Sequence, residues 1–179
     1  MIADALWRVA ERAGLDGASV RRVAAEAGVS PGLVQHYFRT REQMLLFALE
    51  SAAARMAARY DPTAERSPQL AVRELLTQFL PLDGERRAEG WSLFTFLAEA
   101  ARGGPIGQRV RIGMDQVRRR VTADLTRAGG VSEPQLVATT LLALTDGLAA
   151  HVLAEHLTPD QALAILEHQL DAAFLRRAP

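Results

Sequence analysis

The chain has 179 residues, which allows one or two compact domains with a real core, and 49% of them are hydrophobic. Its 21 Lys and Arg residues balance its 21 Asp and Glu residues, so the overall charge indicates neither nucleic acid nor a membrane surface as a partner. The absence of cysteine excludes a disulfide framework, a thiolate metal site and a cysteine nucleophile.

The N-terminal segment and the most apolar stretch of the chain both argue against a membrane role. Residues 1–4 are not the basic region that precedes the apolar core of a signal peptide. Residues 136–157 are strongly apolar but include Asp146, His151 and Glu155, which is typical of a buried helix and not of a membrane span. We therefore expect a cytoplasmic protein without a membrane partner.

Apolar residues recur at spacings of three and four almost throughout, which predicts an all-α fold of about nine helices. Capping residues and helix-breaking residues set their limits. In chain order the helices are expected at about residues 2–13, 19–27, 31–38, 40–60, 67–80, 83–102, 105–128, 132–157 and 158–176. Three capping boxes, each a Ser or Thr followed three residues later by Gln, are predicted at Thr40–Gln43, Ser132–Gln135 and Thr158–Gln161.

The most informative segment is a short capped helix, a three-residue turn and a second short helix. Ser19 caps the first helix, and Gly28 supplies a turn conformation that a β-carbon disfavours. Val29, Val34 and Phe38 are expected to point inward and to hold the second helix against the first. This order of elements is the helix-turn-helix pattern, in which the N-terminal end of the second helix enters the major groove of DNA.

Residues 20–42, VRRVAAEAGVSPGLVQHYFRTRE, closely resemble the DNA-binding signature of the TetR family. The resemblance is strong over about the first fifty residues. It extends more weakly to residues 82–87 and 146–159, which look like the subgroup that resembles the betaine-regulator repressor BetI.

The resemblance implies that the helix-turn-helix contacts double-stranded DNA. It places phosphate contacts at the start of the first helix of the helix-turn-helix and recognition contacts on its second helix. A further phosphate contact is placed at the start of the following helix, where the family usually has lysine. The corresponding residues are Ser19, Arg21 and Arg22, then Pro31, Gly32, Leu33, Gln35, His36 and Tyr37, and finally Arg41. His36 and Arg39 also have a simpler interpretation, as solvated side chains.

The chemistry of these side chains suggests separate roles. Gln35 can pair with adenine through two hydrogen bonds, and Leu33 can contact a thymine methyl group. Tyr37 and the arginines are better suited to phosphates, which fix the register of a protein on DNA without reading its sequence. Because Gln35 and Leu33 replace the tyrosine and threonine common in the family, no base-reading rule is transferred from it.

We expect residues 1–48 to form the DNA-binding domain and residues 49–179 to form a helical domain for ligand binding and dimerisation. The second domain contains no set of nucleophile, acid and base, no glycine-rich phosphate loop and no convincing metal spacing. We therefore expect neither an enzyme nor a resident cofactor or metal. An all-α enzyme that contains a helix-turn-helix is the less favoured alternative.

Aromatic and other apolar residues gather in the middle of the second domain. In the TetR family the corresponding helices surround a small-molecule cavity, and such cavities combine apolar walls with a few polar groups. The candidates for contact with an unknown small-molecule effector are Trp91, Phe94, Phe96, Met114, Thr145 and Asp146. An ordinary core explains each of these residues equally well.

The last two helices are apolar on more than one side, so each needs a second packing partner. In the TetR family they form a four-helix interface with a second copy. The residues expected to serve the core and a homodimer contact are Leu141, Leu144, Leu148, Val152, Leu163, Leu166, Leu170 and Phe174. A two-fold dimer places its recognition helices roughly 34–36 Å apart and requires a near-palindromic site.

These features together predict a homodimeric transcriptional regulator, and the resemblance to the TetR family implies that it is a repressor. Its ligand is expected to move the fourth helix and to alter the spacing of the recognition helices. A ligand-independent DNA-binding protein or an activator remains an alternative, and neither the ligand nor the operator can be identified from the residues.

Overall fold

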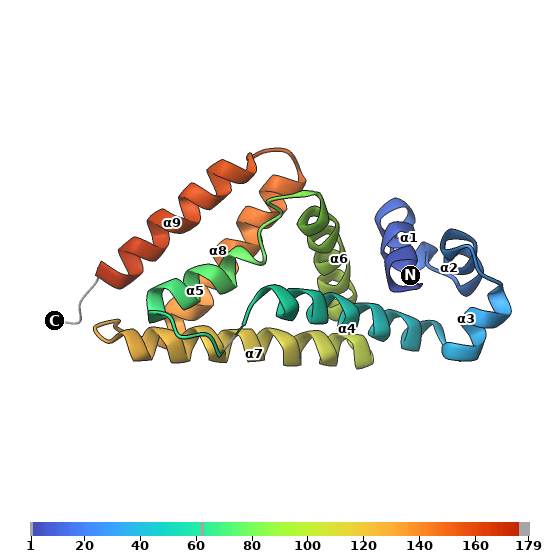
Figure 1. The fold of residues 1–179 in the computed structure, drawn as a ribbon, viewed down its shortest axis with the longest axis horizontal. Coiled ribbons are helices and arrows are strands. Elements are labelled where there is room, and N and C mark those ends of the chain that lie inside the picture. The colour runs from blue at the N-terminus through green and yellow to red at the C-terminus, as the bar shows by residue number, and fades with distance from the viewer. Residues whose placement is uncertain (1, 62, 176–179) are drawn as a thin grey trace. The chain divides into compact units, whose positions relative to one another are not determined.

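A computed structural model describes residues 2–61 and 63–175 of the chain (Figure 1). The elements in this part are α1 (Ile2–Gly17), α2 (Val20–Ala27), α3 (Pro31–Tyr37), α4 (Arg41–Arg59), α5 (Pro68–Thr77), α6 (Gly84–Ala101), α7 (Gly104–Ala128), α8 (Pro134–Leu153) and α9 (Pro159–Leu175). The predicted all-α fold of about nine helices is confirmed.

Side-chain caps explain where most of these helices begin. Ser19, Ser30 and Ser67 each accept a hydrogen bond from the backbone N–H three residues later, at 3.2–3.3 Å. Asp83 does the same for Arg86 at 2.8 Å. Each bond satisfies one of the backbone donors that a helix start leaves unpaired, which is why local sequence was sufficient to predict these positions.

Two of the three predicted capping boxes are present. Gln161 Oε1 accepts from Thr158 N at 2.9 Å, and Thr158 Oγ1 accepts from Gln161 N at 3.2 Å. Thr40 and Gln43 form a variant of the box, because the Gln43 side chain accepts from the backbone N–H of residue 39 instead of residue 40.

The box predicted at Ser132–Gln135 is wrong. The chain enters α8 through Glu133, whose φ of 51° lies in the left-handed region, and no side chain caps this helix start. Pro134 at the first helical position has no backbone N–H to satisfy, which reduces the need for such a cap.

Several predicted helix ends also move. The first helix continues through the expected break at residues 14–17, the fifth ends at Thr77, and α8 ends at Leu153 instead of 157. The early end of α8 has a physical cause, because the guanidinium of Arg87 donates to the carbonyls of residues 152 and 153 at 3.2 Å. The predicted end of the last helix, Arg176, lies outside the described residues.

By its contacts the chain forms two compact units. The first unit is Met1–Ala57 with Trp91–Arg111, and the second is Ala58–Gly90 with Ile112–Pro179. The predicted boundary after residue 48 therefore differs from the division made by packing. The reason lies in the core of the first unit, where the Trp7 ring meets Phe96 edge-on at 5.2 Å and Ile106 and Val110 join the same buried cluster.

The second unit contains α8 and α9, which run side by side in opposite directions after a short connection (Figure 1). The end of α4 is fixed within this unit by Arg59, whose guanidinium pairs with the buried carboxylate of Glu89 and donates to Gln78 at 3.2 Å. Both sides of this ion pair are largely shielded from water, so breaking it leaves a poorly solvated charge.

Within the described chain, α8 alone has the length and apolar composition of a membrane-crossing helix. Only 39% of its most apolar window is buried in the structure. The helix contains a buried threonine, Thr145, and a half-buried carboxyl group, Asp146. Much of its apolar surface therefore lies outside the chain's own core.

Candidate nucleic-acid interface

The turn between α2 and α3 is fixed by backbone geometry. Gly28 has φ 69° and ψ 29°, a left-handed conformation, and the N–H of Val29 donates to the carbonyl of Ala24 at 3.0 Å. Only glycine adopts this conformation without strain, so Gly28 ends α2 within one residue. Ser30 then caps α3, and Pro31 occupies its first turn.

The buried side of α3 consists of very few side chains. Val34 is fully buried, and Phe38 is buried with its ring 5.1 Å from that of Phe47. Val29 packs against the same core. The predicted inward orientation of these three residues is confirmed, and they hold a seven-residue helix that would not persist alone.

The remaining side of α3 is exposed. We call its exposed residues, Pro31, Gly32, Leu33, Gln35, His36 and Tyr37, the α3 face. Tyr37 is 64% exposed, and its ring lies edge-on to His36 at 5.4 Å. All six residues predicted for the recognition helix thus share one accessible surface, with an amide, an imidazole, a phenol and an apolar side chain available for contact.

The arginines near this face differ in their surroundings. Arg21 and Arg22 are exposed, and Arg22 donates to the carbonyl of Gly17 at 3.3 Å. Arg41 is half-buried, and its Nε donates to the carbonyl of Ala18 at 3.1 Å. Arg41 therefore also joins α4 to the residues before α2, a structural role that the sequence alone did not indicate.

Ser19 is exposed at the start of α2, where its oxygen already accepts the capping hydrogen bond. A hydroxyl group can donate while it accepts. Its position in the structure is therefore compatible with both the cap and the predicted phosphate contact.

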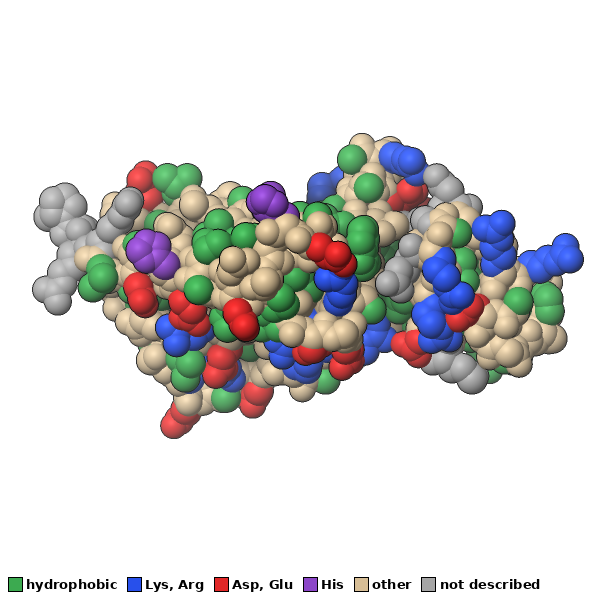
Figure 2. Space-filling model, turned by 90° about the horizontal axis from the view of Figure 1, so that it is seen from above, with side chains coloured by type: hydrophobic (Ala, Val, Ile, Leu, Met, Phe, Trp, Pro, Cys, Tyr) green, Lys and Arg blue, Asp and Glu red, His purple; other side chains and the backbone are tan. Residues whose placement is uncertain are grey.

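The local charge of the helix-turn-helix differs from the neutral whole chain. Residues 19–41 contain four arginines and a single acidic residue, Glu26. The hydrogen bond from Arg8 lowers the pKa of Glu26, burial opposes this, and Arg12 lowers it further. Because arginines of α1 already neutralise this carboxylate, the segment keeps a positive surface suited to phosphate (Figure 2).

The candidates for effector contact are distributed over both units. In the first unit, Trp91 is 42% exposed, Phe94 is half-buried, and Phe96 is fully buried against Trp7. Phe96 thus fills a core. In the second unit, Met114 is 45% exposed, and the buried hydroxyl of Thr145 donates to a carbonyl of its own helix at 2.8 Å.

Asp146 is the most unusual of these candidates. Its carboxyl group is half-buried on α8, and burial raises its pKa from 3.8 to about 6. A desolvated carboxylate of this kind favours a nearby cation or a proton. Among residues 2–61 and 63–175, His, Asp and Glu form no group of three that could hold a metal ion.

The predicted dimer residues fall into two groups. Leu141, Leu148, Val152, Leu166 and Leu170 are buried within the single chain, whereas Leu144, Leu163 and Phe174 are half-buried. The buried five belong to the core of the second unit, because the turn between α8 and α9 brings their two rows of side chains together. They offer a partner little surface.

A different set of residues on the same helices remains exposed. We call it the α8–α9 face, and it consists of Leu136, Thr140, Ala143, Gly147 and His151 on α8 and of Ala164, Ile165 and His168 on α9. Figure 2, viewed from the side of these helices, shows uncharged and hydrophobic side chains over much of their surface. The spacing of three and four on α8 was visible in the sequence, but the inward and outward rows are both apolar, so sequence could not tell them apart.

Comparisons with known proteins agree with this geometry. The family of bacterial regulatory proteins of the tetR type matches residues 2–47, and the C-terminal region of BetI-type transcriptional repressors matches residues 68–175. The transcriptional regulator PksA of Bacillus subtilis is 33% identical over 85% of this chain and 77% of its own length. BetI of Rhizobium meliloti is 27% identical over 82% of this chain and 73% of its own.

Solved structures extend the similarity over nearly the whole chain. A transcriptional regulator from Rhodococcus has a TM-score of 0.87 and 32% identity, covering 99% of this chain and 97% of its own. A regulator from Saccharomonospora viridis in complex with choline has a TM-score of 0.79 over 95% of this chain and 93% of its own, and at 21% identity it supports the fold alone.

Proposed function

The chain belongs to the TetR family of bacterial transcriptional regulators, and on this premise we propose that it is a homodimeric repressor released from a near-palindromic operator by a small molecule. Family membership makes it a DNA-binding regulator and not an enzyme. The dimer, the release by a ligand, the cytoplasmic location and the individual contacts are the proposal.

The α3 face carries the DNA-binding part of the proposal. A helix that buries so little of its surface contributes little to the core, yet caps and a left-handed glycine hold it in place. Gln35 is assigned to base reading, whereas Tyr37 and Arg21 are assigned to phosphates. Arg41 is assigned to a phosphate as well as to its bond with the carbonyl of residue 18.

The α8–α9 face supports the homodimer. A helix with 39% of its most apolar window buried needs further cover, and a two-fold partner supplies it with an identical face. Small residues such as Ala143 and Gly147 allow two helices to approach closely, and the exposed residues of α8 include no Asp, Glu, Lys or Arg. The interface is thereby assigned to the exposed row, with Leu144, Leu163 and Phe174 at its edge.

Asp146 supports a cationic or protonated effector in the second unit. Its raised pKa reflects a carboxyl group that burial has deprived of water, and a positively charged ligand would relieve that cost. The choline complex of the Saccharomonospora regulator makes choline a reasonable first compound to test. The other candidate contacts, Trp91, Phe94 and Met114, remain predictions.

The test is a fluorescence-anisotropy titration of the full chain with a labelled DNA duplex from immediately upstream of its own gene. Gln35→Ala is expected to weaken specific binding by about 5- to 150-fold, since one base contact contributes roughly 1–3 kcal/mol. Tyr37→Phe is expected to weaken binding to all sequences slightly, because it removes a single phosphate contact. Both side chains are exposed, so the fold should not change.

Arg119→Ala is the matched control, because this exposed arginine lies on α7 outside the helix-turn-helix. Equal affinity of wild type for the upstream duplex and a scrambled duplex, or an unchanged affinity of the Gln35 variant, would contradict the assigned role of α3.

Addition of choline chloride to the complex with DNA, at constant ionic strength, tests the proposed effector. Release of wild type but not of Asp146→Asn supports it, and equal release of both proteins, or release of neither, rejects it.

A further inference from the structure

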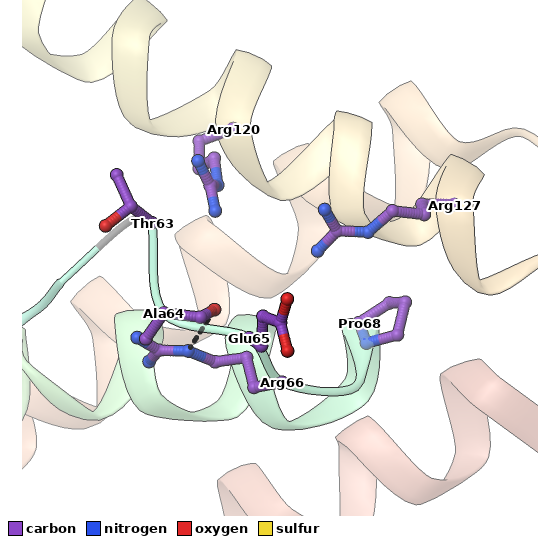
Figure 3. A pocket seen from close by; sticks show the side chains of 7 residues that line it. All are labelled: Thr63, Ala64, Glu65, Arg66, Pro68, Arg120 and Arg127. Carbon is purple, nitrogen blue, oxygen red and sulfur yellow. Dashed lines mark hydrogen bonds between the residues drawn. The ribbon is translucent and has the colours of Figure 1, made fainter.

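A hollow in the second unit gathers three arginines that the proposed DNA-binding function does not use. Its volume is about 530 Å³, and it is lined by Thr63, Ala64, Glu65, Arg66, Pro68, Arg120 and Arg127. Figure 3 shows Arg120 and Arg127 extending from α7 toward the connection between α4 and α5, with the Glu65 carboxylate turned toward them. We call it the arginine hollow.

Two of the arginines are fixed by one buried carboxylate. The side chain of Asp124 is 2% exposed, and its two oxygens accept from Arg120 Nε at 3.0 Å and from Arg127 Nη2 at 2.8 Å. This one carboxylate therefore holds both guanidinium groups in fixed positions on the wall of the hollow.

The third arginine is supported on the opposite wall. The guanidinium of Arg66 pairs with Glu74, donates to the carbonyl of Asp61, and lies over the ring of Tyr60 with its Cζ 5.0 Å from the centroid. Its position is set before any ligand arrives, so less side-chain freedom is lost on binding.

We propose that the arginine hollow binds a small organic anion that carries a carboxylate or phosphate group and also a hydroxyl or ammonium donor. Guanidinium groups match the oxygens of such anions with paired hydrogen bonds. The exposed Glu65 repels a plain anion but accepts a hydrogen bond from a donor on the same molecule. The volume lies within the usual range for small-molecule sites.

The test is isothermal titration calorimetry of the full chain without DNA, so its result does not depend on the proposed operator binding. The probes are glycerol 3-phosphate and malate, which carry both groups, with inorganic phosphate and glycerol as partial mimics. Saturable binding of one of the first two, weaker binding of phosphate and no binding of glycerol are expected. Failure of both organic anions to bind saturably would overturn the proposal.

Variants locate the binding. Arg127→Gln is expected to raise the dissociation constant about tenfold or more, since hydrogen bonds to charged groups are the strong ones. Arg120 still holds Asp124 in this variant, which protects the fold. Arg119→Gln removes the same charge from the same helix outside the hollow and is expected to leave binding unchanged. Equal affinity of the Arg127 variant and wild type would overturn the site.

Glu65→Gln provides a second test that does not endanger folding, because Glu65 is exposed. This variant is expected to bind inorganic phosphate as well as wild type or better, and to lose the preference for glycerol 3-phosphate over phosphate. A preference that stays the same would reject the role of Glu65 and, with it, the requirement for a donor group on the ligand.

Discussion

Both α3 and α8 leave much of their surface outside the chain's own core, but the chemistry of the exposed surface is opposite. The α3 face is polar and aromatic, and hydrogen bonds at both ends of the helix hold it in position. The exposed side of α8 is apolar, and its N-terminus has no side-chain cap. Exposure on a short, well-capped helix fits a polar partner such as DNA, whereas exposure on a long apolar helix fits a second protein surface.

The largest expected effect comes from charging the exposed row of α8 with Gly147→Arg. Apart from its chain neighbours and the backbone of its own helix, no atom lies within 4 Å of the place of a Cβ at this position, so the single chain accepts a side chain there. Two arginines facing each other across a two-fold axis should separate the copies and lower affinity for a two-site operator roughly 1,000-fold.

Light scattering after size-exclusion chromatography measures the first part of this prediction, and anisotropy measures the second. Gln116→Arg, on an exposed position of α7, is the control for added charge. A variant at Gly147 that remains dimeric would show that the α8–α9 face is not the interface.

A smaller effect is expected on the pH dependence of stability. The Asp146 carboxyl group on α8 should change the free energy of unfolding by up to about 3 kcal/mol as the pH rises. The pKa of Asp146 is about 6 in the folded chain against 3.8 otherwise, so the folded state holds its proton more tightly. Stability from this group is therefore greatest below about pH 4 and falls as the pH rises through about 6. Asp146→Asn should remove that fall and be the more stable form at pH 7.

Chemical denaturation at pH 4, 5, 6 and 7 measures this difference. Asp171→Asn, at an exposed position of α9, should leave the pH dependence of wild type unchanged. If the Asp146 variant loses stability with rising pH as wild type does, the carboxyl group is not desolvated in solution.

The smallest of the three effects concerns the turn before α3. Gly28→Ala should cost about 1–2 kcal/mol of stability, because a β-carbon disfavours the left-handed backbone although the space around it is open. Gly32→Ala is the matched control, since Gly32 lies inside α3 and alanine there favours the helix. Thermal unfolding of both variants gives the comparison, and equal stabilities would contradict the assigned role of Gly28.

The same two helices show how far sequence could predict this protein. The limits of α3 depend on Ser30, Gly28 and Pro31, whose effects act within a few residues, so they were predictable. The exposure of the residues proposed to face DNA followed from the same local pattern, and their assignment to DNA contacts came from the family resemblance and stays a prediction.

Which row of α8 is exposed was not predictable, because Leu141 and Ala143 are both apolar and only the packing of the second unit decides which one is buried. The role of Arg41 and the arginine hollow depend on contacts between residues far apart in the chain, which no local pattern reports. The start of α8 was mispredicted because a left-handed Glu133 replaced the expected cap.

The central claim is that two copies, joined through the α8–α9 face, hold one duplex with their α3 faces. Native mass spectrometry of the full chain with the upstream duplex tests it most directly, with Gly147→Arg measured beside wild type. The account predicts two wild-type chains per duplex and almost no complex for the variant at the same concentration. A saturated complex of one chain per duplex, formed equally well by both proteins, would contradict it.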